Sequence, residues 1–237
     1  MADIMTREAS TMEQPSGADI ASGRAVFYDL LAAVFGRLPD RGLLIKIRDG
    51  EFGSLLGKYG CLDEKGFRLG LDRISTYQVS IKERSGEEVL TELAVDRTKI
   101  MRGTGDAGMK PPYEGVYRGG KPGVPILKVK QFYRKAELVP GETVNDSADY
   151  LCVELDFMKQ LCLREKVLRH GDGEAGENIA LIIALQEEFL GMHLGSWVGE
   201  FCHAVGKYAF TDFYRGFALI LDAHIRSDSK RLRSILQ

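Results

Sequence analysis

Residues 177–208 read ENIALIIALQEEFLGMHLGSWVGEFCHAVGKY, and the spacing of apolar residues in this stretch decides the fold class. Large apolar residues recur every three or four positions, which places them on one face of an α-helix. That face consists of Leu190, Leu194, Trp197, Phe201, Val205 and Tyr208. We therefore predict a long helix over Glu177–Tyr208 with this face in the core.

The same periodicity continues outward over most of the chain. In the first half, the further predicted helices are Arg24–Gly36, a short helix carrying Leu43, Leu44 and Ile47 that is interrupted at Gly50–Gly53, and a helix capped by Asp63 with Phe67, Leu71, Ile74 and Ile81 on its face. A further helix follows Ser85-Gly86 and carries Val89, Leu93 and Ile100. The others lie over 126–138, from Leu151 to Cys162 and from Phe213 to His224. No segment alternates apolar and polar residues with the period of a strand. We therefore predict an all-α helical bundle of about nine to ten helices.

Prolines and glycines divide the chain, because proline is excluded from helix interiors. Residues 40–110 and 141–237 contain no proline, whereas residues 103–125 hold four of the seven prolines and seven of the 27 glycines. We predict an irregular loop over 103–125 and a hinge connector over 140–148. The predicted parts are then a polar, mobile tail (1–22), a first helical half (23–139) and a second helical half (149–237).

The composition excludes several classes of protein. With 32 Lys+Arg against 34 Asp+Glu and a net charge of −2, the chain lacks the basic excess of a nucleic-acid binder. Apolar runs such as Ala180–Leu185 are far shorter than the roughly 20 residues that cross a bilayer, so we expect no stable membrane insertion. The first 22 residues are charged without an apolar stretch, and no two arginines are adjacent, so no export signal is expected. The predicted location is the cytoplasm.

The strongest catalytic motif is a glycine pattern. Gly103–Gly108 reads GTGDAG and matches GxGxxG, which in a dinucleotide fold follows a strand and opens a helix. Here a predicted helix precedes it, Pro111-Pro112 follows it, and Lys110 lacks the Ser or Thr of a phosphate-binding loop. We predict a loop, and keep a helical nucleotide-binding hydrolase as an alternative.

Cysteine and histidine spacing indicates no metal site. The cysteines, at positions 61, 152, 162 and 202, form no CxxC pair and are expected to be buried thiols. His193 and His203 lie ten residues apart, which is too far for a ligand pair on one helix face, and both are expected to be partly buried packing residues. We predict no catalytic residues, no metal and no cofactor.

Two features have no evident purpose in a plain helical bundle. The segment Pro111–Tyr117 reads PPYEGVY and places Tyr113 and Tyr117 around a stiff turn, where tyrosines supply large contact area with a polar end. The segment Glu142–Asp156 carries five acidic residues and no Lys or Arg, which suits a basic peptide. Loop packing, and compensation of a helix dipole by Asp149, explain the same features without a partner.

Three motifs resemble the TorD/DmsD family of cytoplasmic redox-enzyme maturation chaperones. PPYEGVY at 111–117 is similar to the family's PPYESVY loop. DYLCVELDFM at 149–158 resembles the family's hinge-and-helix pattern DHxxxELxFM. The third motif resembles the family's Q-x-x-F, H-L-x-x-W and F-Y signature through Gln186, Phe189, His193, Leu194, Trp197, Phe213 and Tyr214.

This resemblance implies an all-helical chaperone, and not an enzyme, whose two halves are joined by a hinge. It implies binding of the twin-arginine signal peptide and the apo form of a molybdenum-cofactor oxidoreductase precursor, which prevents premature export and assists cofactor insertion. The acids Asp146, Asp149 and Glu154 would pair with the peptide's arginines, while tyrosines would contact its apolar part. The implied peptide-binding residues are Pro112, Tyr113, Glu114, Tyr117, Asp146, Asp149, Tyr150 and Glu154.

Three residues depart from the family's pattern, and two questions stay open. Gly115 replaces a serine, Ser147 replaces the hinge proline, and Tyr150 replaces the hinge histidine. Ser147 suggests a less rigid hinge, and Tyr150 keeps the ability to hydrogen-bond and to stack on an arginine. A general helical scaffold without signal-peptide specificity stays an alternative. Because a hinge invites domain swapping, the expected state is a monomer or a domain-swapped dimer.

Overall fold

The computed structural model describes residues 15–59, 64–103, 108–119, 123–138, 147–171 and 175–237. Within these ranges the chain forms eleven helices and no strand, so the predicted all-α fold is confirmed. The helices are α1 (Gly17–Gly36), α2 (Arg41–Arg48), α3 (Glu51–Tyr59), α4 (Lys65–Ser80), α5 (Gly86–Arg102), α6 (Glu114–Arg118), α7 (Val124–Lys135), α8 (Leu151–His170), α9 (Ala175–Met192), α10 (Leu194–Tyr208) and α11 (Asp212–Leu236).

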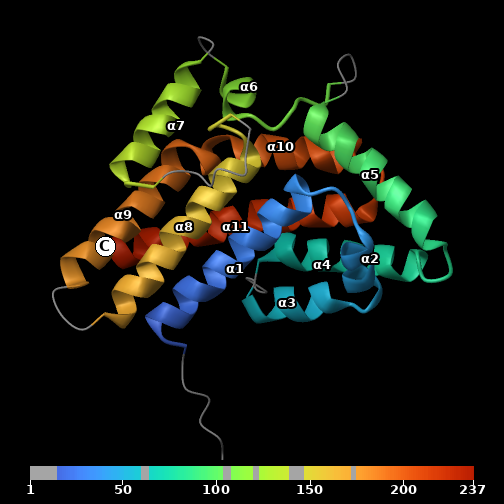
Figure 1. Cartoon of the computed structure of the whole chain (residues 1–237), viewed down its shortest axis with the longest axis horizontal. Coiled ribbons are helices and arrows are strands. Elements are labelled where there is room, and N and C mark those ends of the chain that lie inside the picture. The colour runs from blue at the N-terminus through green and yellow to red at the C-terminus, as the bar shows by residue number, and fades with distance from the viewer. Residues whose placement is uncertain (1–14, 60–63, 104–107, 120–122, 139–146, 172–174) are drawn as a thin grey trace, which may run out of the picture.

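The most extensive helix contacts join the two predicted halves of the chain. Helix α1 lies along α8, and α4 lies along α11, as Figure 1 shows. A single hydrophobic core contains aromatic residues from both halves, among them Phe35 and Phe67 before the predicted hinge and Trp197 and Phe217 after it. Most of the 140–148 connector lies outside the described residues, so the hinge stays a prediction.

The first helix begins earlier than the sequence pattern predicted. Ser16 caps α1 through a capping box, in which the Ser16 hydroxyl accepts a hydrogen bond from the Asp19 amide at 3.1 Å. The Asp19 carboxylate in turn accepts one from the Ser16 amide at 3.1 Å. Ala18 and Ala21 are buried. Residues 17–22 are therefore helix and not tail, because capping and small apolar residues extend the helix past the stripe of large side chains. Residues 1–14 lie outside the described part.

The long helix predicted over Glu177–Tyr208 is two helices, α9 and α10, bent by 46° at His193. A Cβ atom on Gly195 would lie 2.5 Å from the carbonyl oxygen of Leu190, so the bend requires glycine at this position. The apolar spacing runs through the bend without a change of period, and spacing alone therefore does not reveal it.

The predicted loop over 103–125 is only partly irregular. It contains the short helix α6, and α7 starts inside it at Val124, with Pro125 in its first turn. Glu114 and Met109 of this segment are buried, so it is part of the core and not only a surface loop.

Two other boundaries also differ from the predictions. Gly50, with φ of +69°, separates α2 from α3, while Glu51, Phe52 and Gly53 belong to α3. The predicted cap Asp63 lies outside the described residues, and Glu64 is the N-cap of α4.

Among the described helices, none is by itself long and apolar enough to cross a membrane. Helices α9 and α10 meet the length and composition criteria only when taken together across their bend. Most of their large apolar side chains, including Phe189, Leu194 and Trp197, are buried in the core, while Leu181 and Met192 are exposed.

Helices α4 and α11 touch through a pair of glycines, and this contact gives a first prediction. A Cβ atom on Gly216 would lie 2.7 Å from the Gly70 carbonyl oxygen and 2.8 Å from the Ile74 side chain. We expect Gly216→Ala to lower the free energy of unfolding by about 1–3 kcal/mol, as overpacking does. Urea unfolding measures the change. The matched control Gly206→Ala, where no atom lies within 4 Å of the new Cβ, should instead stabilise by up to about 1 kcal/mol. Equal effects at both glycines would contradict the close contact.

Candidate functional site

The PPYEGVY segment and the start of α8 are held together by backbone hydrogen bonds. The amide of Leu151 donates to the Pro112 carbonyl at 3.0 Å, and the amide of Glu114 donates to the Asp149 carbonyl at 2.9 Å. These bonds form an isolated antiparallel bridge. Two motifs that lie far apart in sequence thus meet at one place, which we name the α6–α8 junction.

The junction carries a rim of aromatic side chains. The rings of Tyr113 and Tyr150 lie 5.1 Å apart, and Tyr113 is half-buried while Tyr150 is buried. The ring of Tyr117 lies 5.4 Å from that of Trp197 and meets Phe201 edge-on at 6.2 Å. Trp197 and Phe201 belong to the core, so Tyr113 and Tyr117 are the partly exposed tyrosines of the rim.

Asp149 is almost fully buried and uses its carboxylate to hold the junction together. One oxygen accepts a hydrogen bond from the Gly115 amide at 3.1 Å, and the other accepts one from the Ser147 hydroxyl at 2.5 Å. A Cβ atom on Gly115 would lie 3.2 Å from the Asp149 carboxylate. Glycine at this position therefore lets the segment approach the acid closely. Asp146, the other predicted hinge acid, lies outside the described residues.

Glu114 ties the junction to the bend between α9 and α10. Its side chain has no exposed surface, and one oxygen lies 2.9 Å from Nδ1 of His193. The other oxygen accepts a hydrogen bond from the Arg118 guanidinium at 2.6 Å, and the same guanidinium nitrogen donates to the Met192 carbonyl at 2.6 Å. His193 and His203 were both predicted to be partly buried packing residues. His193 is instead fully buried and hydrogen-bonded, and His203 is exposed.

Glu154 lies beneath the aromatic rim and points into the core. One oxygen accepts a hydrogen bond from the indole nitrogen of Trp197 at 3.1 Å, and the other has no partner among the described atoms. Burial, followed by the neighbouring carboxyl group of Glu114, raises the pKa of Glu154 well above its ordinary value. Burial therefore favours the protonated form of this side chain.

The three described acids of the acidic segment do not form an exposed strip, and Glu142 and Asp146 lie outside the described residues. Asp149 and Glu154 are buried, and the half-buried Asp156 pairs with Lys159. The hydrogen-bond and ion-pair partners of these acids come from α6, α8, α10 and the residues before α8, while one oxygen of Glu154 has none among the described atoms. In this conformation Glu154 has no surface that a partner could reach.

Exposed apolar side chains are also present on α6 and on helices next to it. They are Val116 on α6, Val124 and Leu127 on α7, and Met192 at the end of α9. Helix α6 packs against both α7 and α10 at one end of the bundle (Figure 1). Apolar surface next to partly exposed tyrosines is typical of a protein-contact site.

The glutamine of the third motif lies in a different, buried polar network. Gln186 accepts a hydrogen bond from Arg24 at 2.5 Å and donates one to Glu165 at 3.0 Å. Arg24 also pairs with Asp228. Neither periodicity nor the motifs indicated Arg24, Glu165 or Asp228, because their partners are distant in sequence.

The remaining candidate motifs are the glycine pattern, the cysteines and the metal-binding residue types. Gly103 ends α5 with φ of +73°, so a helix and not a strand precedes the glycine pattern, of which residues 104–107 lie outside the described ranges. Cys152, Cys162 and Cys202 are buried without disulfides, and burial raises the pKa of Cys162 to about 12. The described residues hold no group of metal-binding side chains.

Comparisons with known proteins show to which family the chain is similar. A family model described as nitrate reductase delta subunit matches residues 63–203, which include the α6–α8 junction. Chaperone protein TorD of Vibrio atlanticus is 24% identical over 192 residues, covering 75% of this chain and 85% of that protein. TorD of Vibrio cholerae is 21% identical over 217 residues, covering 90% of this chain and 94% of that protein. TorD of Colwellia psychrerythraea is 25% identical over 232 residues, covering 89% and 92%.

Proposed function

We propose a client for this chain from the premise that it belongs to the TorD family of chaperones. As a member of this family it is a redox-enzyme maturation chaperone and not an enzyme. The proposed client is the precursor of a molybdenum-cofactor oxidoreductase, bound in the cytoplasm through its twin-arginine signal peptide before cofactor insertion. In this proposal the chain delays export until the client is assembled.

The observation that carries the proposal is the α6–α8 junction itself. It presents two partly exposed tyrosines, Tyr113 and Tyr117, beside exposed apolar residues of α6, α7 and α9. A signal peptide combines arginines with an apolar stretch. The apolar stretch suits the exposed apolar surface, and arginine planes stack on tyrosine rings.

We propose different roles for Asp146 and Asp149. Asp146 is the acid that we propose to contact the arginines directly, since bidentate guanidinium–carboxylate pairs are strong and directional. Asp149 holds the Gly115 amide and so keeps the PPYEGVY segment in place. Its charge also contributes a negative potential beneath the rim, which favours a basic peptide.

The second prediction tests this role of Asp149. We expect Asp149→Asn to weaken binding of a synthetic twin-arginine signal peptide about tenfold. The hydrogen bond from the Gly115 amide would then go to a neutral acceptor, and the negative potential beneath the rim would be lost. The dependence of affinity on salt should fall as well. Isothermal titration calorimetry at low and moderate salt measures both.

The controls separate a specific role from a general change of charge. Asp49→Asn removes an exposed acid at the end of α2, outside the junction, and should leave the affinity unchanged. A twin-lysine peptide should bind more weakly, because lysine lacks the planar fork of arginine. Equal affinity of wild type and Asp149→Asn would contradict the role of this acid. Equal capture of a client with and without its signal peptide would instead favour a general scaffold.

A further inference from the structure

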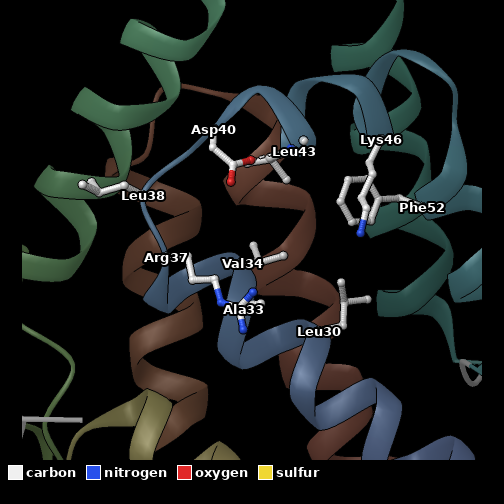
Figure 2. A pocket seen from close by; sticks show the side chains of 10 residues that line it. Leu30, Ala33, Val34, Arg37, Leu38, Asp40, Leu43, Lys46 and Phe52 are labelled. Carbon is white, nitrogen blue, oxygen red and sulfur yellow. Dashed lines mark hydrogen bonds between the residues drawn. The ribbon is translucent and has the colours of Figure 1, made fainter. Parts of the chain in front are cut away.

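A second surface, which shares no residue with the α6–α8 junction, has the opposite charge pattern. It is a cavity of about 210 Å³ where the end of α1 meets α2 and α3. Its apolar wall consists of Leu30, Ala33, Val34, Leu43 and Phe52. Figure 2 shows Leu30 and Val34 on the α1 side of this cavity, with Leu43 on α2 beyond them.

Two cations line the cavity from separate elements. Arg37 follows the end of α1 and Lys46 lies on α2, and Figure 2 shows them on opposite sides of the apolar wall. Both are exposed, and within the described residues neither side chain forms a salt bridge or hydrogen bond. Asp40, the acid of the lining, caps α2 by accepting a hydrogen bond from the Leu43 amide at 2.8 Å. The cavity lining therefore holds two cations and one acid, and neither cation is in a salt bridge with a side chain of the described residues.

The size of the cavity favours a side chain over a whole small molecule. Small-molecule sites usually enclose roughly 300–1,000 Å³, and this cavity is smaller. Interfaces between proteins are often anchored by one apolar side chain that fills such a pocket, with polar contacts around it. Leu38 is 66% exposed at the cavity's edge and adds apolar surface beyond the pocket.

We propose that this α1–α2 cavity is a second docking site, which takes an apolar side chain from an acidic segment of a partner protein. The anchor would contact Val34, Leu43 and Phe52. Flanking carboxylates of the segment would pair with Arg37 and Lys46, which is the charge complementarity that steers and orients partners. The chain would then hold two segments of opposite charge on separate surfaces, a basic one at the junction and an acidic one at the α1–α2 cavity.

The test is a titration followed by methyl NMR of the full chain with labelled leucine and valine. The probe is the acetylated peptide Glu-Leu-Leu-Glu, and its charge-matched control is Lys-Leu-Leu-Lys. We expect the acidic peptide to shift the methyl signals of Leu30, Val34 and Leu43, and the basic peptide to leave them in place. Shifts of equal size with both peptides, or none with either, would overturn the proposal.

Charge reversal identifies the cations. The double variant Arg37→Glu with Lys46→Glu should bind the acidic peptide at least about tenfold more weakly. The matched control is Arg68→Glu with Lys82→Glu, which makes the same change of net charge at exposed cations outside the cavity. Equal weakening in both pairs would overturn the assignment. Vesicles of anionic phosphatidylglycerol that shift the same signals, where the peptide does not, would assign the cavity to a membrane and overturn it too.

The same samples keep this inference separate from the proposed function. The reversal pair should bind the twin-arginine peptide as the wild type does, because the junction is unchanged. If the acidic peptide leaves the cavity signals in place while the twin-arginine peptide binds, the second site fails and the proposed function stands. If the acidic peptide binds at the cavity and the twin-arginine peptide binds nowhere, the proposed function fails and the second site stands.

Discussion

Replacing Arg24 by methionine is expected to lower the free energy of unfolding by about 3–5 kcal/mol, because it leaves the buried carboxylate of Asp228 without its cation. Arg24 is nearly fully buried. Its guanidinium donates to Asp228 at 2.6 and 2.8 Å and to Glu165 at 2.8 Å. Removing one partner of such a group costs far more than the pair contributes over an apolar replacement.

The geometry explains why this loss of stability should be large for a single substitution. Arg24 lies on α1 and its partners lie on α8, α9 and α11, so one side chain connects four helices. Burial opposes the ionisation of Asp228, but Arg24 outweighs burial and holds the pKa of that carboxyl below its ordinary value. The hydroxyl of Tyr28 also donates to Asp228, at 2.7 Å, and would be left beside an unpaired charge.

Urea unfolding of matched variants tests this expectation. The control is Arg233→Met, which removes the same side chain from an exposed pair with Glu187 at 2.9 Å. That variant should lose less than about 1 kcal/mol, since exposed ion pairs contribute little. The double variant of Arg24→Met with Asp228→Asn should recover part of the loss, because the orphaned charge is gone. Equal losses of unfolding free energy in Arg24→Met and Arg233→Met would contradict a large contribution of the buried network to stability.

The Arg24 network also shows what the sequence could not reveal about the fold. Helix periodicity is local, so it predicted most helices correctly from short windows. The partners of Arg24 lie 141 to 204 residues away, and no spacing rule connects them. By contrast, the Ser16–Asp19 capping box was visible in the sequence. The spacing of large apolar residues does not reveal it, because the box consists of small polar residues.

The bend at His193 had a tertiary cause that the apolar pattern hides. His193 meets Glu114, which is 79 residues earlier, and Arg118 holds the Met192 carbonyl at the end of α9. Both contacts come from α6, inside a segment that was predicted to be an irregular loop. A predicted loop gave no reason to expect partners there, so one straight helix was the natural interpretation.

At the candidate site, the motifs indicated which residues meet but not how deeply they lie. Acidic residues are almost never fully buried unless they are paired, so a run of acids indicates a surface. A signal for Glu154 was nevertheless present, because it follows the buried Leu151 by three residues and precedes the buried Met158 by four. That spacing places Glu154 on the inward face of α8.

Replacing Glu154 by glutamine is expected to make the protein progressively more stable than the wild type as the pH rises from 5 to 8. The folded-state pKa of Glu154 is raised by burial above its unfolded value of 4.5, so the native state holds a proton that the unfolded state releases. The contribution of Glu154 to the free energy of unfolding of the wild type is fully present below pH 4.5. This contribution falls as the pH rises towards the folded-state pKa. The slope approaches about 1.4 kcal/mol per pH unit for one proton.

Glutamine removes this titration and keeps the shape of the side chain. Its amide oxygen can still accept the hydrogen bond from the indole nitrogen of Trp197. The other charged or titratable groups around Glu154 are Glu114 and Arg118 on α6, Tyr133 on α7, Asp149 before α8 and His193 at the bend. They are unchanged in the variant, so the difference between variant and wild type isolates Glu154, provided that both are measured at every pH.

The measurement is urea unfolding of both proteins at pH 5, 6, 7 and 8. His224 makes a separate contribution in this range, because burial lowers its pKa from 6.5 to about 4, and this contribution cancels in the difference. The control Glu177→Gln, at an exposed residue of α9, should give a difference that does not change with pH. Parallel stability curves for Glu154→Gln and the wild type would contradict a neutral Glu154. A difference that widens with pH would establish that a protonated acid supports Trp197, and through it Tyr117, beneath the aromatic rim.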